Sequence, residues 1–179
     1  METLLQQVIN GFSLGSVYAL IAVGYSLVYS ILLFSNFAHG GFLVIGGYIC
    51  YYTLAAVGNN IWVASLLAFL GAGVSAGLVE RGAYKPIRGR TNVTLYLLIA
   101  SMGMSIVIEN IFVVTVGGRF RALPPVIPMT PVSVFGLATT SAFDILSLVM
   151  AMIFLAGLQV FLSTTKWGLA IRAASYDLK

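Results

Sequence analysis

Apolar residues fill this chain in long runs, and short polar segments separate one run from the next. Between Glu2 and Glu80 there is no Asp, Glu, Lys or Arg, and no polar stripe recurs at helical period. A helix that crosses a bilayer needs about 20 apolar residues, so this stretch alone has room for about three spans. The runs predict transmembrane helices over residues 8–32, 39–57, 61–79, 93–116 and 142–163.

The segments between these runs carry turn-forming and helix-breaking residues. The polar pair at 35–36 precedes the second run, and Gly-Asn-Asn at 58–60 predicts a tight turn before the third. Residues 80–92 are basic and are expected to form a loop, and residues 117–141 contain four prolines and are expected to form a longer one. The sequence therefore predicts an all-α, polytopic transmembrane bundle of about five spans.

Composition supports a membrane protein and excludes a soluble domain. The chain is 60% hydrophobic and 8% charged, whereas soluble domains carry about 25% charged residues. The net charge of +4 comes from Lys and Arg that lie between the spans, where membrane topology places them. No nucleic-acid partner is expected, and the lipid bilayer is the expected surrounding.

The distribution of basic residues predicts the orientation of the spans. Residues 80–92 and 164–179 carry seven of the nine Lys and Arg, and the proline-rich loop carries the other two, Arg119 and Arg121. Because cytoplasmic loops are enriched in Lys and Arg, the first two segments are expected inside and the proline-rich loop outside. Three preceding spans then put the N-terminus outside, whereas a re-entrant segment at 35–57 would reverse it.

No catalytic constellation is present in the sequence. It contains no G-x-x-x-x-G-K-[ST] phosphate loop, no H-E-x-x-H and no G-x-S-x-G, and it has one histidine and one cysteine. A single histidine does not build a zinc site. No catalytic residue, metal or cofactor is therefore expected, and ATP hydrolysis would require another subunit.

Ionisable residues inside predicted spans are functional candidates, because a buried charge in lipid is costly unless it is paired or neutralised. Glu109 lies past the middle of the fourth span, and two interpretations stay open. It lines a polar cavity facing a substrate ammonium, or it is a protonated or snorkelling carboxylate in a helix interface. Asp144 begins the fifth span, where a carboxylate stabilises a helix N-terminus. His39, beside two glycines, is expected to be a boundary loop residue rather than a ligand.

Several motifs resemble those of a known family. The stretch NGFSLGSVYALIAVGY at 10–25 resembles the opening of branched-chain amino acid permeases of the LivH type, and NFAHG at 36–40 resembles their most recognisable motif. Similar stretches are E-R-x-A-Y-x-P-x-R from Glu80, G-M-S-I from Gly103, W-G-x-A-x-R-A from Trp167, and D-L-K at 177–179. Urea permeases of the same superfamily share most of these motifs, so the resemblance indicates the family more than the substrate.

The resemblance implies a subunit of an ATP-driven importer of branched-chain amino acids in the bacterial inner membrane. Its partners would be a homologous second permease subunit, cytoplasmic ATPase subunits and a periplasmic substrate-binding protein. Asn36, His39 and Gly40 would lie at a bend near the translocation path or cytoplasmic gate. The residues of the implied ATPase-docking loop are Lys166, Gly168, Arg172 and Asp177.

Two departures limit what the resemblance implies. Relatives carry an uncharged amide at the position of Glu109, so a substrate role there is not implied by the family. A complete permease of this kind continues through more spans after the docking loop. Residues 1–179 are therefore expected to form one permease domain that is truncated at its C-terminal end.

Three other functions are possible from the sequence. A permease of the same superfamily would carry urea or short amides. A passive channel for a small neutral solute would need a pore lined by polar groups, which are sparse here. An intramembrane enzyme would need paired carboxylates, a Ser/His pair or a metal cluster, and the sequence shows none of these.

Overall fold

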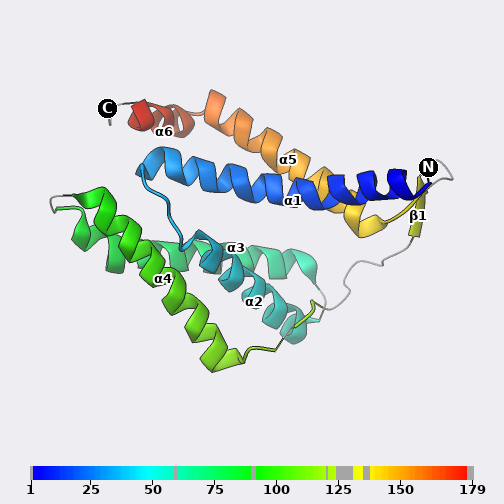
Figure 1. Ribbon diagram of the computed structural model, residues 1–179, viewed down its shortest axis with the longest axis horizontal. Coiled ribbons are helices and arrows are strands. Elements are labelled where there is room, and N and C mark those ends of the chain that lie inside the picture. Colours follow the sequence, from blue (N-terminus) through cyan, green and yellow to red (C-terminus); the bar gives the residue numbers. More distant parts are fainter. Residues whose placement is uncertain are drawn as a thin grey trace. The chain divides into compact units, whose positions relative to one another are not determined.

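The computed structural model describes residues 2–58, 60–89, 92–119, 121–123, 131–134 and 138–176. Within these residues, five helices are long and apolar enough to cross a membrane (Figure 1). The chain divides into two units, one of Met1–Ile31 with Ile127–Lys179 and one of Leu32–Val126. The predicted all-α, polytopic transmembrane class is confirmed.

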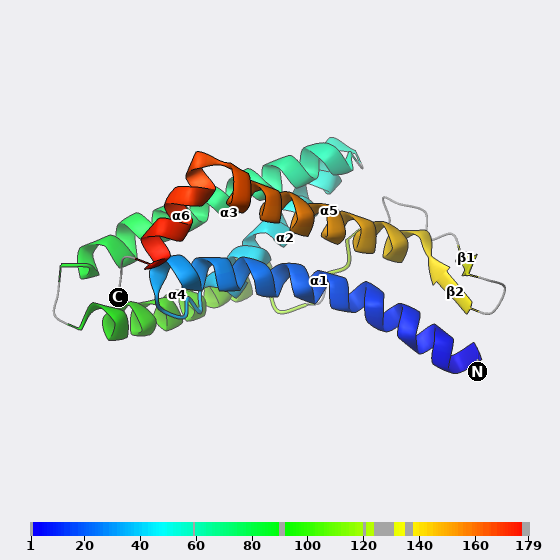
Figure 2. The ribbon, with the colours of Figure 1, turned by 90° about the horizontal axis from the view of Figure 1, so that it is seen from above.

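The first unit contains α1 (Glu2–Leu32), α5 (Ala142–Thr164) and α6 (Lys166–Tyr176). Figures 1 and 2 both show α1 and α5 side by side. A short antiparallel hairpin of β1 (Pro131–Val134) and β2 (Ala138–Ser141) precedes α5, inside the segment expected to be a loop. The tail after residue 164, also expected to be a loop, is helical over α6 because Thr165 starts a new helix.

The start of α5 is held by a polar cluster. The Ser141 hydroxyl accepts a hydrogen bond from the Asp144 backbone N–H (3.1 Å), and the Ser141 N–H donates to Asp144 Oδ2 (3.4 Å). This reciprocal pair is a capping box, which satisfies helix N–H groups that have no partner within the helix. Ser13 on α1 donates to Asp144 Oδ1 (3.1 Å), so the carboxylate also ties α1 to α5. The predicted structural role of Asp144 is confirmed.

The second unit contains α2 (His39–Val57), α3 (Ile61–Val79) and α4 (Val93–Val116). A glycine ends α2: Gly58 adopts a left-handed conformation (φ 77°), which only glycine adopts without strain. The Asn60 side chain then accepts a hydrogen bond from the Val63 N–H (3.3 Å) and caps α3. These residues make the predicted tight turn.

The segment after α3 corrects a sequence-based expectation. Residues 80–92 were expected to form a loop, but a π-helical turn, η1 (Glu80–Tyr84), and a 3-10 turn, η2 (Lys85–Ile87), extend the helix. The proline at 86 lies in the first turn of η2, where a missing N–H costs no hydrogen bond. Arg88 and Glu80 form a salt bridge of 3.0 Å across these turns.

Glycines set the closest helix contacts in the second unit. A Cβ added at Gly41 of α2 would lie 3.0 Å from Ile108 Cδ1 of α4, and one at Gly71 of α3 would overlap the Ile49 side chain of α2. Other glycines of the spans make no such contacts within the described residues. Added Cβ atoms meet nothing within 4 Å in the described part of the chain at Gly11, Gly15, Gly73 and Gly77.

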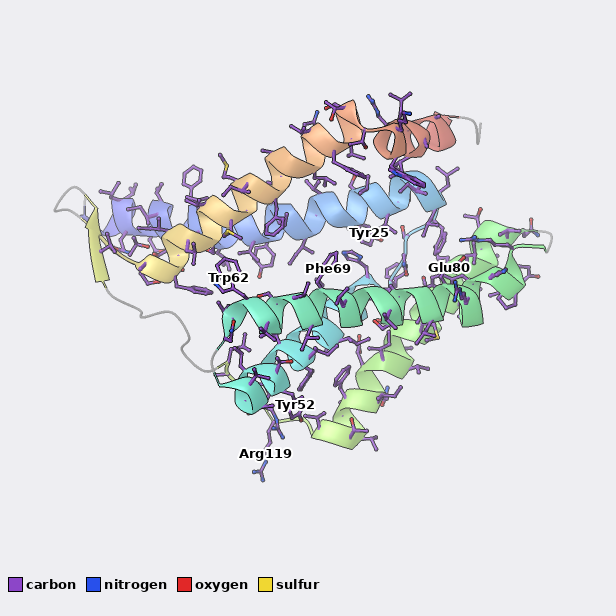
Figure 3. The ribbon with its side chains drawn as sticks, turned by 180° about the vertical axis from the view of Figure 1, so that it is seen from behind. Tyr25, Tyr52, Trp62, Phe69, Glu80 and Arg119 are labelled. Carbon is purple, nitrogen blue, oxygen red and sulfur yellow. The ribbon has the colours of Figure 1, made fainter. Side chains whose placement is uncertain are left out.

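Most large apolar side chains of the spans face outward. Trp62 and Phe69 project from α3 in Figure 3, and both are exposed. Glu80 marks the opposite end of the same helical stretch from Trp62. Such surfaces suit lipid or other membrane helices, because neither requires a polar covering.

Candidate functional site

The candidate site is the non-helical linker, residues 33–38, between α1 and α2. Leu33 has a positive φ of 54°, which turns the chain out of α1. Asn36 at the centre of the linker is 7% exposed, and Ala38 is fully buried. Irregular backbone at membrane depth is tolerated only where protein groups satisfy its N–H and C=O groups. The residues that form hydrogen bonds with this linker therefore define the site.

Asn36 supplies one set of these partners. Its Oδ1 accepts hydrogen bonds from the Tyr84 hydroxyl (2.8 Å) and from the Ala38 backbone N–H (3.2 Å). Its backbone carbonyl accepts from the His39 N–H (3.2 Å). A single asparagine thus closes the local turn and joins the linker to η1.

Ser101 of α4 supplies the second set. Its hydroxyl accepts a hydrogen bond from the Phe37 N–H (3.2 Å) and lies within donor distance of the Ser35 carbonyl (3.2 Å). The carbonyl of Leu98, one turn earlier in α4, is also within reach at 2.8 Å. The Ser101 side chain is fully buried, so these backbone groups depend on it rather than on water.

An aromatic contact seals the same place. The rings of Phe34 and Tyr84 meet edge to face, with centroids 5.8 Å apart at 87°. Both residues are buried, and they form a core cluster with Leu97. We call Phe34, Asn36, Tyr84 and Ser101 together the Asn36 cluster. It connects the linker to two other elements of the second unit, η1 and α4.

The structure brings only part of the predicted gate motif into this cluster. Asn36 is its centre, and His39 is the first residue of α2, half-buried, with its backbone bonded to Asn36. The expectation that His39 lies in a loop is therefore corrected. Gly40 is exposed and has open space at its Cβ position, whereas the neighbouring Gly41 contacts Ile108 of α4.

Glu109 lies away from the Asn36 cluster on an outward face of α4. The Ser105 hydroxyl donates to Glu109 Oε1 (3.1 Å), and the Asn110 amide donates to the carbonyl of Ile106 (2.8 Å). Ser101, Ser105 and Glu109 follow one another at spacings of four residues, which places them along one side of the helix. The structure thus joins the exposed carboxylate to the buried cluster by a polar stripe on α4.

The predicted docking residues lie on or beside α6. Gly168 is pressed against the end of α5: an added Cβ would lie 2.5 Å from both Phe161 O and Leu162 Cα. Thr165 caps the new helix, because its hydroxyl accepts from the Gly168 N–H (3.0 Å). These two contacts fix the sharp junction between α5 and α6.

The charged members of the same set that the structure describes are both exposed. Lys166 and Arg172 are exposed, and Arg172 Nη2 donates to the Ser163 carbonyl of α5 (3.3 Å). Trp167 beside them is 76% exposed. Asp177 lies outside the described residues. The described part of α6 therefore carries an exposed tryptophan and two exposed cations, and one of these cations also bonds the end of α5.

The Asn36 cluster has the chemistry of a structural contact that holds the linker, rather than that of a catalytic site. Its polar groups are an amide, a phenol and a hydroxyl, and its bonds hold backbone in place. Within the described residues, no group of three or more His, Cys, Asp or Glu side chains is placed to hold a metal ion.

Comparison with known proteins identifies the family. A family model described as "Branched-chain amino acid transport system / permease component" matches residues 7–178. The chain belongs to this family. The resemblance recognised in the sequence motifs is thereby confirmed, and with its five apolar helices the chain is a multi-pass membrane protein.

Individual relatives of this permease family extend the comparison. The chain is 36% identical to the high-affinity branched-chain amino acid transport system permease protein BraD of Pseudomonas aeruginosa, over 98% of the chain and 60% of BraD. It is 37% identical to the corresponding permease protein LivH of Escherichia coli strain K12, again over 98% of the chain and 60% of the relative. A probable LivH of Methanocaldococcus jannaschii is 26% identical over 87% of the chain. No solved structure matches the chain.

The chain covers only part of the length of these relatives. It spans 60% of the length of BraD and of the Escherichia coli LivH. The family assignment covers nearly the whole chain, and the Asn36 cluster, α4 and all of α6 lie inside the matched residues 7–178.

Three members of the cluster, Phe34, Tyr84 and Ser101, were not identified as site residues from the sequence. Tyr84 stood in a motif similar to the family's, but nothing in its spacing indicated a bond to Asn36. Ser101 is one serine in an apolar span, and such a serine commonly bonds a carbonyl of its own helix. Only the fold shows that it also holds the linker.

Proposed function

We propose that the chain is a membrane-spanning permease subunit of an ATP-driven, binding-protein-dependent importer of branched-chain amino acids. The observation that carries this proposal is the 36–37% identity, over 98% of the chain, to permeases named for high-affinity branched-chain amino acid transport. Residues 1–179 act within one permease domain in a bacterial inner membrane. The relatives named above give no support to transport of urea or of short amides.

The proposed partners follow from what the chain lacks. It has no phosphate loop, so cytoplasmic ATPase subunits supply the hydrolysis. A homologous second permease subunit completes the pathway, and a periplasmic binding protein delivers the amino acid from outside. The outward apolar side chains of the spans support a membrane partner, since they form broad surfaces without polar covering.

The proposed ATPase contact is α6. Its tryptophan at 167 and its cations Lys166 and Arg172 are exposed, and Gly168 holds the helix at a fixed angle to α5. Tryptophan and arginine are both enriched at the energetically important centres of interfaces. The excess of basic residues in this segment supports a position of this end of α5 in the cytoplasm.

The proposed moving part is the bend at the Asn36 cluster. Transport by alternating access needs helices that change their packing around a fixed pathway. The linker between α1 and α2 is held by a few hydrogen bonds, which break at modest cost, and its neighbour Gly41 allows α2 to lie close to α4. Glu109, on the polar stripe of α4, is proposed to face the pathway.

Co-purification tests the proposed complex directly. The chain, together with any sequence that follows it in its gene, is affinity-purified from native membranes, and bound proteins are identified by mass spectrometry. We expect a P-loop ATPase to accompany the wild type and to be lost from Trp167→Ala and Arg172→Ala.

A matched control removes the same residue type on the side of the membrane that is proposed to be outside. Trp62→Ala removes an exposed tryptophan that Figure 3 places at the opposite end of α3 from Glu80, and it should leave the ATPase bound. If no ATPase accompanies even the wild type, the importer assignment fails. If the ATPase stays with the α6 variants, α6 is not its contact.

A further inference from the structure

A cavity separate from the Asn36 cluster lies in the second unit. It is at the ends of α2 and α4 that we propose to lie on the outer, periplasmic side of the membrane. Its volume is about 340 Å³, within the range of small-molecule sites. Its walls are apolar or aromatic and its rim is cationic, with the side chains of Val44, Tyr48, Tyr51, Leu123, Arg119 and Arg121. Figure 3 shows Arg119 extending beyond the end of α2 that carries Tyr52.

One arginine of the rim is held in place. Arg121 Nη2 donates to the Val116 carbonyl at the end of α4 (3.2 Å), and its guanidinium carbon lies 5.8 Å from the centre of the Tyr51 ring. Both contacts orient the guanidinium and leave most of its five N–H donors available. The aromatic wall is also fixed, because Tyr48 stacks on Phe112 with centroids 4.5 Å apart.

The charge of this rim has no counterpart nearby. Among the residues that the structure describes, no carboxylate lies within salt-bridge distance of Arg119 or Arg121, and the one such pair is Arg88 with Glu80. Membrane topology does not explain these two cations either, since basic residues are favoured in cytoplasmic loops and these lie on the other side of the proposed membrane. Two arginines that line an apolar and aromatic cavity instead suit a carboxylate attached to an apolar group.

We propose that this cavity binds the carboxylate of a small apolar amino acid at the outer face of the permease. The guanidiniums of Arg119 and Arg121 hold the carboxylate, and the walls at Val44, Tyr48 and Leu123 take the apolar side chain. Gly47 in the lining leaves room for it. The assignment of the ligand as an amino acid, and of the face as outer, rests on the proposed function.

The same carboxylate chemistry has a second source, an Asp or Glu side chain of the substrate-binding protein. The two sources differ in one requirement: a free amino acid binds the permease without the binding protein. The experiment therefore measures amino acid binding to the permease alone and, separately, binding-protein association.

Binding is measured by titration with saturation-transfer NMR, which detects weak ligands, on the full-length permease in nanodiscs without ATP. The probes are L-leucine and L-leucinamide, which lacks the carboxylate. We expect L-leucine to bind and L-leucinamide to bind at least about tenfold more weakly. We expect Arg121→Gln and Arg119→Gln to weaken L-leucine binding by about tenfold or more, since a hydrogen bond to a charged group is lost.

Two further variants keep the proposal falsifiable. Arg81→Gln removes one exposed cation from the proposed cytoplasmic side and should bind L-leucine as the wild type does. Arg121→Lys keeps the charge but loses the forked geometry, and should fall between wild type and Arg121→Gln. No binding of L-leucine by the wild type, or equal binding by wild type and Arg121→Gln, would overturn the proposal.

The remaining measurements distinguish the two sources of the carboxylate. They also distinguish failure of this site from failure of the proposed function. If the arginine variants lose only co-sedimentation with the binding protein and keep L-leucine binding, the amino acid site is overturned. ATP-driven uptake is measured on the same preparations. If the wild type takes up leucine but the arginine substitutions do not change leucine binding, the importer assignment holds and the proposed site is wrong. If L-leucine binding depends on the arginines but the wild type shows no ATP-driven uptake, the site is supported and the importer assignment fails.

Discussion

At the scale of single residues, the conformation of the linker depends on the Asn36 side chain. One amide oxygen accepts hydrogen bonds from both the Tyr84 hydroxyl (2.8 Å) and the Ala38 N–H (3.2 Å). Asparagine suits this position because its short amide reaches its own backbone two residues on. A residue without an acceptor would leave two donors unpaired where little water is available to replace it.

Removal of the Tyr84 hydroxyl tests this bond. Tyr84→Phe keeps the ring against Phe34 but deletes the donor, and we expect the permease to lose about 0.6 kcal/mol of stability, with an upper bound of about 1.7 kcal/mol. Asn36→Ala should cost more, because it leaves the Tyr84 hydroxyl and the Ala38 N–H unpaired. The measurement is the free energy of unfolding in mixed micelles. Tyr96→Phe, at an exposed tyrosine of α4, is the control, and an equal loss there would contradict the account.

Two adjacent glycines make a second test at this scale. A Cβ at Gly41 would lie 3.0–3.3 Å from three atoms of Ile108, whereas one at Gly40 meets open space within this chain. We expect Gly41→Ala to destabilise by about 1–3 kcal/mol through overpacking, and Gly40→Ala to be neutral or stabilising. Thermal unfolding of both variants gives the comparison. The double variant Gly41→Ala/Ile108→Ala should recover part of the loss, since the two closest atoms are removed.

At the scale of elements, the linker is held from two sides. Tyr84 of η1 reaches it through Asn36, and Ser101 of α4 bonds the backbone at Ser35 and Phe37. Because both contacts hold the same six-residue segment, loss of one should make the other less effective. We therefore expect the two elements to hold the linker jointly.

The junction between α5 and α6 offers a sharper test of an element. An added Cβ at Gly168 would lie 2.5 Å from backbone atoms of Phe161 and Leu162, and backbone does not move aside as a side chain does. Gly168→Ala should therefore turn α6 away from its position and sharply reduce co-purification of the ATPase. Gly157→Ala in α5 has open space and should retain the ATPase. Full retention by Gly168→Ala would show that the position of α6 does not matter for docking.

The sequence predicted the spans well and the connection after Val79 poorly, for a physical reason. Apolar runs of about 20 residues have few alternatives in a bilayer, so the ranges 39–57, 61–79 and 93–116 agree with the structure. The basic residues after Val79 suggested a loop, yet η1 and η2 continue the helix, because charged side chains at a span's end can reach the membrane surface.

The candidate site was predictable only in part. The turn at Asn36 was visible in the sequence, and the resemblance singled it out. Its partners Tyr84 and Ser101 lie 48 and 65 positions further along, and single-sequence patterns carry no information about which distant residues meet (84 − 36 = 48; 101 − 36 = 65). The side of α4 that carries Glu109 likewise became known only from the fold.

At the scale of the whole molecule, the account depends on orientation. The count of basic residues predicts that residues 80–92 lie inside and the proline-rich loop outside. Cys50 is the chain's only cysteine, so a Cys50→Ser background allows single reporters. We expect Gly89→Cys to react with a membrane-impermeant maleimide only in inverted vesicles, and Leu123→Cys only in right-side-out vesicles. The opposite pattern would place the arginine cavity in the cytoplasm.

The central claim is that this permease moves branched-chain amino acids inward at the expense of ATP hydrolysed by a partner. Its most direct test is uptake of radiolabelled L-leucine into proteoliposomes that hold the full-length permease, its second subunit and the ATPase, with the binding protein outside. The account predicts accumulation above the external concentration that requires ATP and the binding protein and is not competed by urea. Leucine that only equilibrates across the membrane, at the same rate with and without ATP, would contradict it.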